Sequence, residues 1–226
     1  MFTSEDPILT LPGPWGVRID ILPSFGILLV LFVGFQPTIW SVAIFAVVAL
    51  SILLHELGHA WGNLVQGLSV NRVALWGGGG FCEGDPRATA SERELVVAMG
   101  PIVNLALWAI CSIAALQVEA ANPDAARYDL VVVAWLLAKA AWINLWLFGF
   151  NMIPVHPLDG GKLFLLGLFR ICDRRRAAFI SGAVGLVLSI LWVPAMIASF
   201  LLTGHALMFV PSIALHREMM RTRAVL

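Results

Sequence analysis

The sequence predicts an all-α polytopic membrane protein with five or six transmembrane helices and a small re-entrant or interfacial β element. Of its 226 residues, 60% are hydrophobic and only 12% are charged, and the mean hydropathy is +0.89. An ordinary globular domain is about half apolar and about a quarter charged. Long apolar segments recur along the chain, and one glycine-rich segment between two of them alternates in the manner of a strand.

A helix needs about 20 apolar residues to cross a bilayer. Spans of that kind are expected near 21–35, 40–66, 93–117, 129–153 and 177–203. A weaker segment near 205–216 is short and contains Pro211, so it would be a half-span or a surface helix. No internal repeat is apparent, and we expect residues 1–226 to form one membrane-embedded domain.

The distribution of charge predicts the orientation in the membrane. The 14 basic and 14 acidic residues cancel, so no global field favours nucleic acid as a partner. If the N-terminus is cytoplasmic, the inner segments hold nearly all the arginines, including Arg174 to Arg176, whereas the outer connections hold only Arg127. Three cysteines without a short common spacing argue against a disulfide framework and a thiolate zinc site.

The β element is expected between the second and third spans. A strand is predicted over Val70, Asn71, Arg72, Val73, Ala74, Leu75 and Trp76. Four glycines, Gly77 to Gly80, follow it and permit tight turns and close backbone approach. Backbone that is not helical is tolerated near a membrane where it is buried in protein or lines a wet cavity.

The second span carries three ionisable groups, His55, Glu56 and His59, in the pattern H-E-x-x-H. Positions four apart on a helix share one face, so both imidazoles can bind one metal ion, and Glu56 can reach a metal-bound water. Zinc suits two imidazoles and a carboxylate, with a fourth position left open. Ionisable groups are costly inside a membrane, which favours a functional site over a core histidine. The predicted orientation places this site in the cytoplasmic half of the bilayer.

A third ligand is expected from the stretch NMIPVHPLDGG, residues 151–161, at the end of the fourth span. Pro154 and Pro157 disfavour continuous helix, so the chain should open into a loop there and project the carboxylate of Asp159. His156 is a rival ligand from the same loop. A turn with an Asp cap for the following helix would also explain the pattern.

The two motifs together resemble the paired signatures of the site-2 protease family, which are intramembrane zinc metalloproteases whose second motif is N-x-x-P-x-x-P-L-D-G. Three further stretches are similar to the family: WGVRIDILPSFGILLVLF at 15–32, GGF at 79–81 and MGPIVNLALW at 99–108. The resemblance covers nearly the whole chain. It implies one zinc ion bound by His55, His59 and Asp159, with Glu56 as the catalytic base, and it favours Asp159 over His156.

The mechanism that this resemblance implies uses a zinc-bound water as nucleophile, with Glu56 taking its proton and passing it to the leaving amine. Asn151 is a candidate donor to the developing oxyanion, or a residue that packs helices through a hydrogen bond. Asn144 and Asn104 are weaker candidates, and Asn104 would instead shape the third span. The strand 70–76 is a candidate for holding an unwound substrate segment by strand addition.

The expected substrate is a membrane-embedded segment of a single-span protein, cleaved in regulated intramembrane proteolysis, and the other expected partner is the lipid bilayer. A zinc transporter or carrier is an alternative from another class, although it would use several ligand sets and would not need Glu56. A catalytically inactive membrane scaffold is a third reading. No PDZ insertion or regulatory C-terminal domain is recognisable, so substrate selection would come from the membrane domain or from a regulatory membrane partner.

Overall fold

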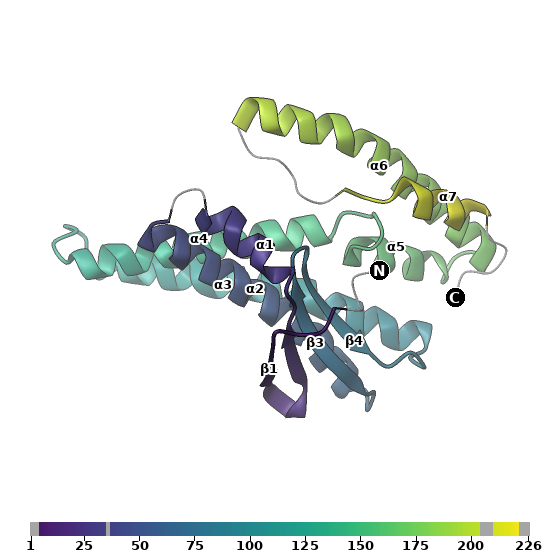
Figure 1. Cartoon of the computed structure of the whole chain (residues 1–226), viewed down its shortest axis with the longest axis horizontal. Helices are drawn as coiled ribbons and strands as arrows, with labels where there is room; N and C mark the ends of the chain where they lie inside the picture. Colours follow the sequence, from purple (N-terminus) through teal and green to yellow (C-terminus); the bar gives the residue numbers. More distant parts are fainter. Residues whose placement is uncertain (1–4, 35–36, 204–209, 222–226) are drawn as a thin grey trace. The chain divides into compact units, whose positions relative to one another are not determined.

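The computed structural model describes residues 5–34, 37–203 and 210–221, which fall into two compact units, Met1–Gly149 and Phe150–Leu226 (Figure 1). The first unit holds a small sheet and the helices that begin before residue 149. The second unit holds the loop after the third long helix and the helices that follow it. Each unit is described by itself below.

The first unit contains a four-stranded sheet in the order β1-β2-β3-β4. Its strands are β1 (Leu9–Pro12), β2 (Arg18–Ile21), β3 (Val70–Trp76) and β4 (Gly79–Gly84). β1 and β4 pair antiparallel with their neighbours, whereas β2 and β3 are parallel. A 3-10 turn, Pro14–Gly16, links β1 to β2. The predicted strand at residues 70–76 is therefore confirmed; Gly77 and Gly78 form the turn that follows it, and Gly79 and Gly80 begin β4.

The position of β3 in the sheet bears on its expected role, which is to hold an unwound substrate segment by strand addition. β3 pairs with β2 on one edge and with β4 on the other, so it has little free edge to offer an added strand. The sequence could not show this because the edges of a strand are decided by which distant segments pair with it. The exposed edges of this sheet belong to β1 and β4.

A buried carboxylate ties three strands together. Asp20 of β2 is completely buried and accepts a hydrogen bond from Thr10 Oγ1 of β1 at 2.8 Å. Its other oxygen is 3.3 Å from Arg72 Nη1 of β3 and 3.1 Å from Arg18 Nη2. A buried charge is stable when it is paired and hydrogen-bonded, as here. The sheet is thus cross-linked by polar contacts on one face.

The other face of the sheet packs on helix α2 (Ile39–Leu64). Buried side chains of Val17, Ile19, Val73 and Ala60 form this core, and Leu53, Leu57 and Leu64 of α2 extend it. Because Ala60 adjoins His59 in sequence, the sheet supports the same turn of α2 that carries the H-E-x-x-H motif. Apolar contact of this kind stabilises by about 25 cal/mol per Å² removed from water.

The expected first span is a short element. The segment near 21–35 contains the end of β2, α1 (Phe25–Leu29) and one π-helical turn, η2 (Val30–Gly34). The apolar helix Phe25–Gly34 spans ten residues, or about 15 Å at 1.5 Å per residue, which is about half of a hydrocarbon core. Pro23 and Pro37 stand on either side of it and limit continuous helix.

Helices α2, α3 (Ala90–Ala120) and α4 (Tyr128–Asn151) account for the next three expected spans. Both α2 and α3 begin with a capping box, in which Thr38 pairs with Ser41 and Thr89 pairs with Glu92. α2 and α3 approach closely because a Cβ at Gly58 would lie 2.8 Å from the carbonyl oxygen of Met99.

The second unit contains α5 (Asp159–Leu168), α6 (Arg174–Thr203) and α7 (Ile213–Arg221). A core of Leu165, Leu168, Ala177 and Met219 joins the three helices. Within the described residues, four helices are long and apolar enough to cross a membrane, namely Ile39–Leu64, Ala90–Ala120, Tyr128–Asn151 and Arg174–Ala198. The weaker expected segment near 205–216 lies partly outside the described residues, and its described end leads into α7.

Candidate metal centre

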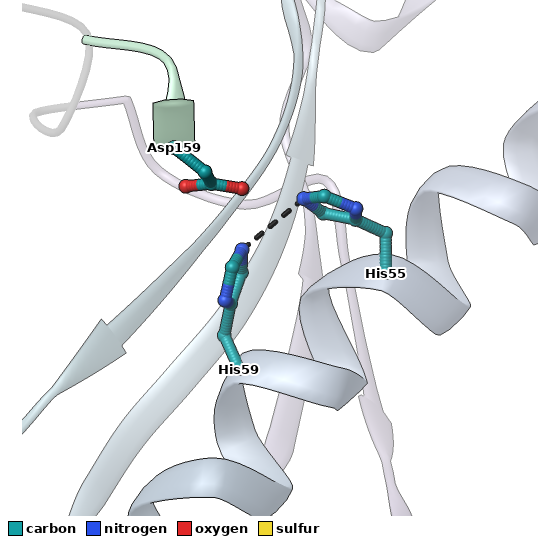
Figure 2. Close-up of side chains that lie close together, drawn as sticks. All are labelled: His55, His59 and Asp159. Atoms are coloured by element: carbon teal, nitrogen blue, oxygen red, sulfur yellow. Dashed lines mark hydrogen bonds between the residues drawn. The ribbon is translucent and has the colours of Figure 1, made fainter. Parts of the chain in front are cut away.

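The H-E-x-x-H motif lies on consecutive turns of α2, as the sequence predicts. His55, Glu56 and His59 are all buried, and Figure 2 shows the two imidazoles projecting from the same side of the helix. The His55 and His59 rings meet edge to face with their centroids 4.7 Å apart. Their Nε2 atoms point toward each other and are 3.1 Å apart.

A backbone carbonyl fixes the protonation of His59. Its Nδ1 is 2.7 Å from the carbonyl oxygen of Val96 in α3. A carbonyl oxygen only accepts, so Nδ1 carries the proton and donates it. In the neutral ring, Nε2 of His59 therefore presents a lone pair.

A chain of buried amides fixes His55 in the same way. Asn144 Nδ2 donates to the Ala140 carbonyl and to Ser51 Oγ, both at 2.9 Å, which turns its Oδ1 toward Asn104. Asn104 Nδ2 donates to that oxygen at 2.8 Å, so Asn104 Oδ1 faces Nδ1 of His55 and accepts its proton. Nε2 of neutral His55 also presents a lone pair.

Two lone pairs facing each other are unfavourable unless a cation or proton lies between them. Zinc–imidazole bonds are about 2.0–2.1 Å, and at a tetrahedral angle this places two ligand nitrogens about 3.3 Å apart. The observed 3.1 Å between Nε2 of His55 and Nε2 of His59 agrees with that spacing. Orientation of each imidazole by a hydrogen bond to its other nitrogen is typical of metal-binding histidines.

A glycine in α3 leaves room beside the imidazoles. A Cβ at Gly100 would lie 2.5 Å from Nε2 of His59 and 2.7 Å from Nε2 of His55. No real Cβ tolerates such contacts, so only glycine fits at this position. The space next to both lone pairs is kept open by the absence of a side chain.

Asp159 is the first residue of α5 and is buried. Lys162, one turn later, donates from Nζ to Asp159 Oδ1 at 3.1 Å, and the helix N-terminus also favours a negative charge there. The ligand atoms of His55, His59 and Asp159 all lie within 4.8 Å of one another, a group that could hold one metal ion (Figure 2). Two imidazoles and one carboxylate form a donor set that suits zinc.

The rival ligand His156 has another environment. Its Nε2 is 3.4 Å from Ser181 Oγ of α6. Burial, assisted by the neighbouring His216 and Lys162, lowers the pKa of His156 to about 4, so the ring is neutral at neutral pH. His156 is not part of the group that could hold a metal ion, whereas Asp159 is.

Two further predicted site residues, Glu56 and Asn151, lie outside the group of three ligands. Glu56 lies over Gly80 of β4, where a Cβ would be 2.5 Å from Glu56 Cγ and 2.9 Å from Oε1. Asn151 is the last residue of α4, is partly buried and is not one of the three grouped ligands. The amide chain through Asn144 and Ser51 was not foreseen, although an asparagine in an apolar helix signals a buried hydrogen bond.

Residues 43–192 match the sequence model of peptidase family M50. The chain belongs to peptidase family M50. The match includes the whole of the H-E-x-x-H motif and Asp159, so it confirms the resemblance drawn from those residues.

Individual relatives agree with the family. A zinc metalloprotease of Methanocaldococcus jannaschii is 25% identical over 181 residues, which are 78% of this chain and 50% of that protein. Rip3 of Mycobacterium tuberculosis is 33% identical over 156 residues, which are 68% of this chain and 38% of that protein. The chain thus spans half or less of the length of these curated relatives.

The fold also has a solved counterpart. The structure of a site-2 protease from Methanocaldococcus jannaschii matches with a TM-score of 0.62 at 20% identity, covering 96% of this chain and 97% of that one. Four apolar helices and membership of family M50 make the chain an integral membrane protein. Zinc is the metal that suits this chain, because the group of two imidazoles and one carboxylate could hold a zinc ion and the relatives are zinc metalloproteases.

Proposed function

We propose that this chain is an intramembrane zinc endopeptidase of the site-2 protease type that cleaves transmembrane segments of single-span membrane proteins. The observation that carries the proposal is the pair of inward-facing Nε2 lone pairs of His55 and His59, grouped with the Asp159 carboxylate. These three side chains would bind one zinc ion. When bound, zinc polarises a carbonyl group and acidifies water.

Glu56 is proposed as the general base and acid. It follows His55 directly on α2, and its carboxylate would take a proton from the attacking water and later give it to the leaving amine nitrogen. Asn151, at the end of α4, is proposed to donate a hydrogen bond to the developing oxyanion. Both roles extend the family assignment to particular atoms of this chain.

Strand addition to the sheet is proposed as the way in which a substrate is held, with β4 rather than β3 as the accepting strand. β4 lies at the edge of the sheet, and its Gly80 is directly against the Glu56 side chain. A cleaved segment must leave its helix before its carbonyl can be reached, and an exposed strand edge would bind such a segment through backbone groups. A substrate strand paired with β4 would then place one of its peptide bonds beside Glu56.

A peptide inhibitor tests strand addition. An extended peptide from the model substrate should inhibit cleavage, and the same peptide methylated on alternate backbone nitrogens should inhibit at least about tenfold less, because it loses ladder hydrogen bonds. Equal inhibition by both peptides would argue against β4 as the docking edge.

The proposed orientation places the N-terminus and the metal centre on the cytoplasmic side. It is supported by the excess of arginine in the segments that this orientation places inside, compared with Arg127 alone outside. Cytoplasmic water would then have a short path to the centre. Regulatory membrane partners would act on substrate delivery.

The deciding experiment compares the wild type with Glu56→Gln in nanodiscs that contain a single-span model substrate. Bound zinc and cleavage are measured together, and Glu119→Gln, which alters an exposed carboxylate at the end of α3, serves as the control. We expect Glu56→Gln to keep zinc and lose at least 100-fold in cleavage rate, because it removes the proton acceptor. Undiminished cleavage would refute the mechanism.

The same preparation separates the carrier alternative. Within the described residues, a single group of three potential ligands is found, whereas a carrier would be expected to place several along a path. Zinc flux into sealed liposomes, without cleavage, would support a carrier and contradict the peptidase proposal.

A further inference from the structure

In the loop between α4 and α5, residues 152–158, one backbone N–H donates to a residue far along the chain. Two of the positions 153–158 are proline, so four amide N–H groups remain there. Ile153 donates to Phe150 O at 3.2 Å, Val155 to Ile153 O at 2.7 Å, and Leu158 to Val155 O at 2.9 Å. The fourth amide, that of His156, donates to Nε2 of His216 on α7 at 3.2 Å.

His216 is arranged to accept that hydrogen bond. It is completely buried, and its Nδ1 is 2.7 Å from the carbonyl oxygen of Ser212 and 3.3 Å from Ser189 Oγ. The Ser189 hydroxyl donates to the Gly185 carbonyl at 2.6 Å, so its oxygen can only accept from the ring. Both contacts place the proton on Nδ1 and leave Nε2 of the neutral ring as an acceptor.

The packing of α7 on α6 fixes the position of this imidazole. A Cβ at Gly182 would lie 2.9 Å from the His216 carbonyl oxygen and 3.0 Å from Met220 Cγ. A Cβ at Gly185 would overlap the His216 ring itself. The ring therefore sits directly on the α6 backbone, and it cannot move without moving α7.

The loop in turn is joined closely to the start of α5. A Cβ at Gly160 would overlap the carbonyl group of Met152, and a Cβ at Gly161 would lie 2.5 Å from the Val155 carbonyl carbon. Such close approach makes the loop and the first turn of α5 one packed piece. A displacement of the His156 amide would therefore be passed on to Asp159, three residues later.

We propose that His216 is a positioning residue that acts through the His156 amide to hold Asp159 in its ligand position. This inference rests on the proposed function in one respect, that Asp159 is a ligand of the metal. In this proposal, the role of α7 is to supply the acceptor for the His156 amide. The role requires a hydrogen-bond acceptor at the position of His216 Nε2.

Two variants of the 226-residue chain separate the acceptor from the packing. His216→Gln keeps a carbonyl oxygen able to reach the place of Nε2, whereas His216→Leu fills a similar volume without an acceptor. We expect His216→Leu to weaken zinc binding about 10–100-fold, as losses of residues that orient metal ligands do. His216→Gln should stay within about threefold of the wild type. Affinity is measured by competition with a chromophoric chelator.

Hydrogen exchange of the His156 amide tests the contact without relying on zinc. In the metal-free wild type this amide should be protected, and His216→Leu should accelerate its exchange at least about tenfold, with His216→Gln close to the wild type. An unprotected His156 amide in the wild type would overturn the proposal whether or not the variants fold. Equal loss of zinc affinity in both variants would also overturn it, because packing alone would then explain the loss.

The two readouts distinguish failure of this inference from failure of the proposed function. If the wild type binds no zinc, Asp159 is not a ligand and the proposed function fails, yet the exchange experiment still reports on the contact between His216 and the loop. If zinc binds tightly in every variant, only the positioning role is refuted.

Discussion

Replacing Gly100 by alanine should abolish tight zinc binding while leaving the helices intact. The added Cβ would lie 2.5 Å from Nε2 of His59 and 2.7 Å from Nε2 of His55, whereas ordinary contact begins at 3.4 Å. The shortfall is therefore about 0.7–0.9 Å at both ligand atoms. Metal–ligand distances tolerate about 0.2 Å, so the imidazoles would have to leave their positions.

The expected loss is at least about 100-fold in zinc affinity, or about 2.8 kcal/mol, since each tenfold change corresponds to about 1.4 kcal/mol. The assay is chelator competition on purified protein in detergent, with thermal unfolding as a check of the fold. Gly149→Ala is a matched control, because a Cβ at Gly149 meets no atom within 4 Å. Wild-type affinity in a folded Gly100→Ala protein would refute the deduced position of the metal.

Three further predictions follow from the site and the loop. Asn104→Leu should lower zinc affinity about 10–100-fold, as measured by chelator competition, because the Nδ1–H group of His55 would lose the acceptor that orients the ring. Gly80→Ala should reduce cleavage about tenfold or more with zinc retained, because it displaces Glu56, and an unchanged rate would contradict that contact. The fold lowers the pKa of His156 from 6.5 to about 4, so the unfolded chain binds more protons between these pH values. Stability should therefore fall as the pH drops through this window, and His156→Gln should show a shallower loss in thermal unfolding.

The sequence predicted the residues whose signals are local. Helical spacing places His55 and His59 on one face, and two prolines with two glycines indicate the loop that leads into Asp159. Alternation before four glycines indicates the strand now seen as β3. Each of these inferences needed no more than a dozen neighbouring residues, over which backbone preferences act directly.

Features that depend on distant pairing could not be predicted in this way. The interior place of β3 is set by β2, about fifty residues earlier, and Asn104 reaches His55 across a separation of 49 residues. The helix in the first expected span is shorter than the apolar composition alone predicts, because prolines stand on either side of it. His216 carries no local pattern at all, since its role depends on two glycines of α6 and one amide of the loop.

The parallel pairing of β2 with β3 has a consequence for the order of synthesis. Ile19 pairs with Val73, and the intervening chain contains α1, η2 and α2. On the ribosome, β2 emerges first and must wait for its partner until the whole of α2 has been made. Pairings of such long sequence separation form slowly, because the entropy of closing the chain is lost before any contact is gained. The support beneath the H-E-x-x-H turn therefore assembles only after that turn has left the ribosome, so a truncated nascent chain carries the histidines without the sheet that holds them.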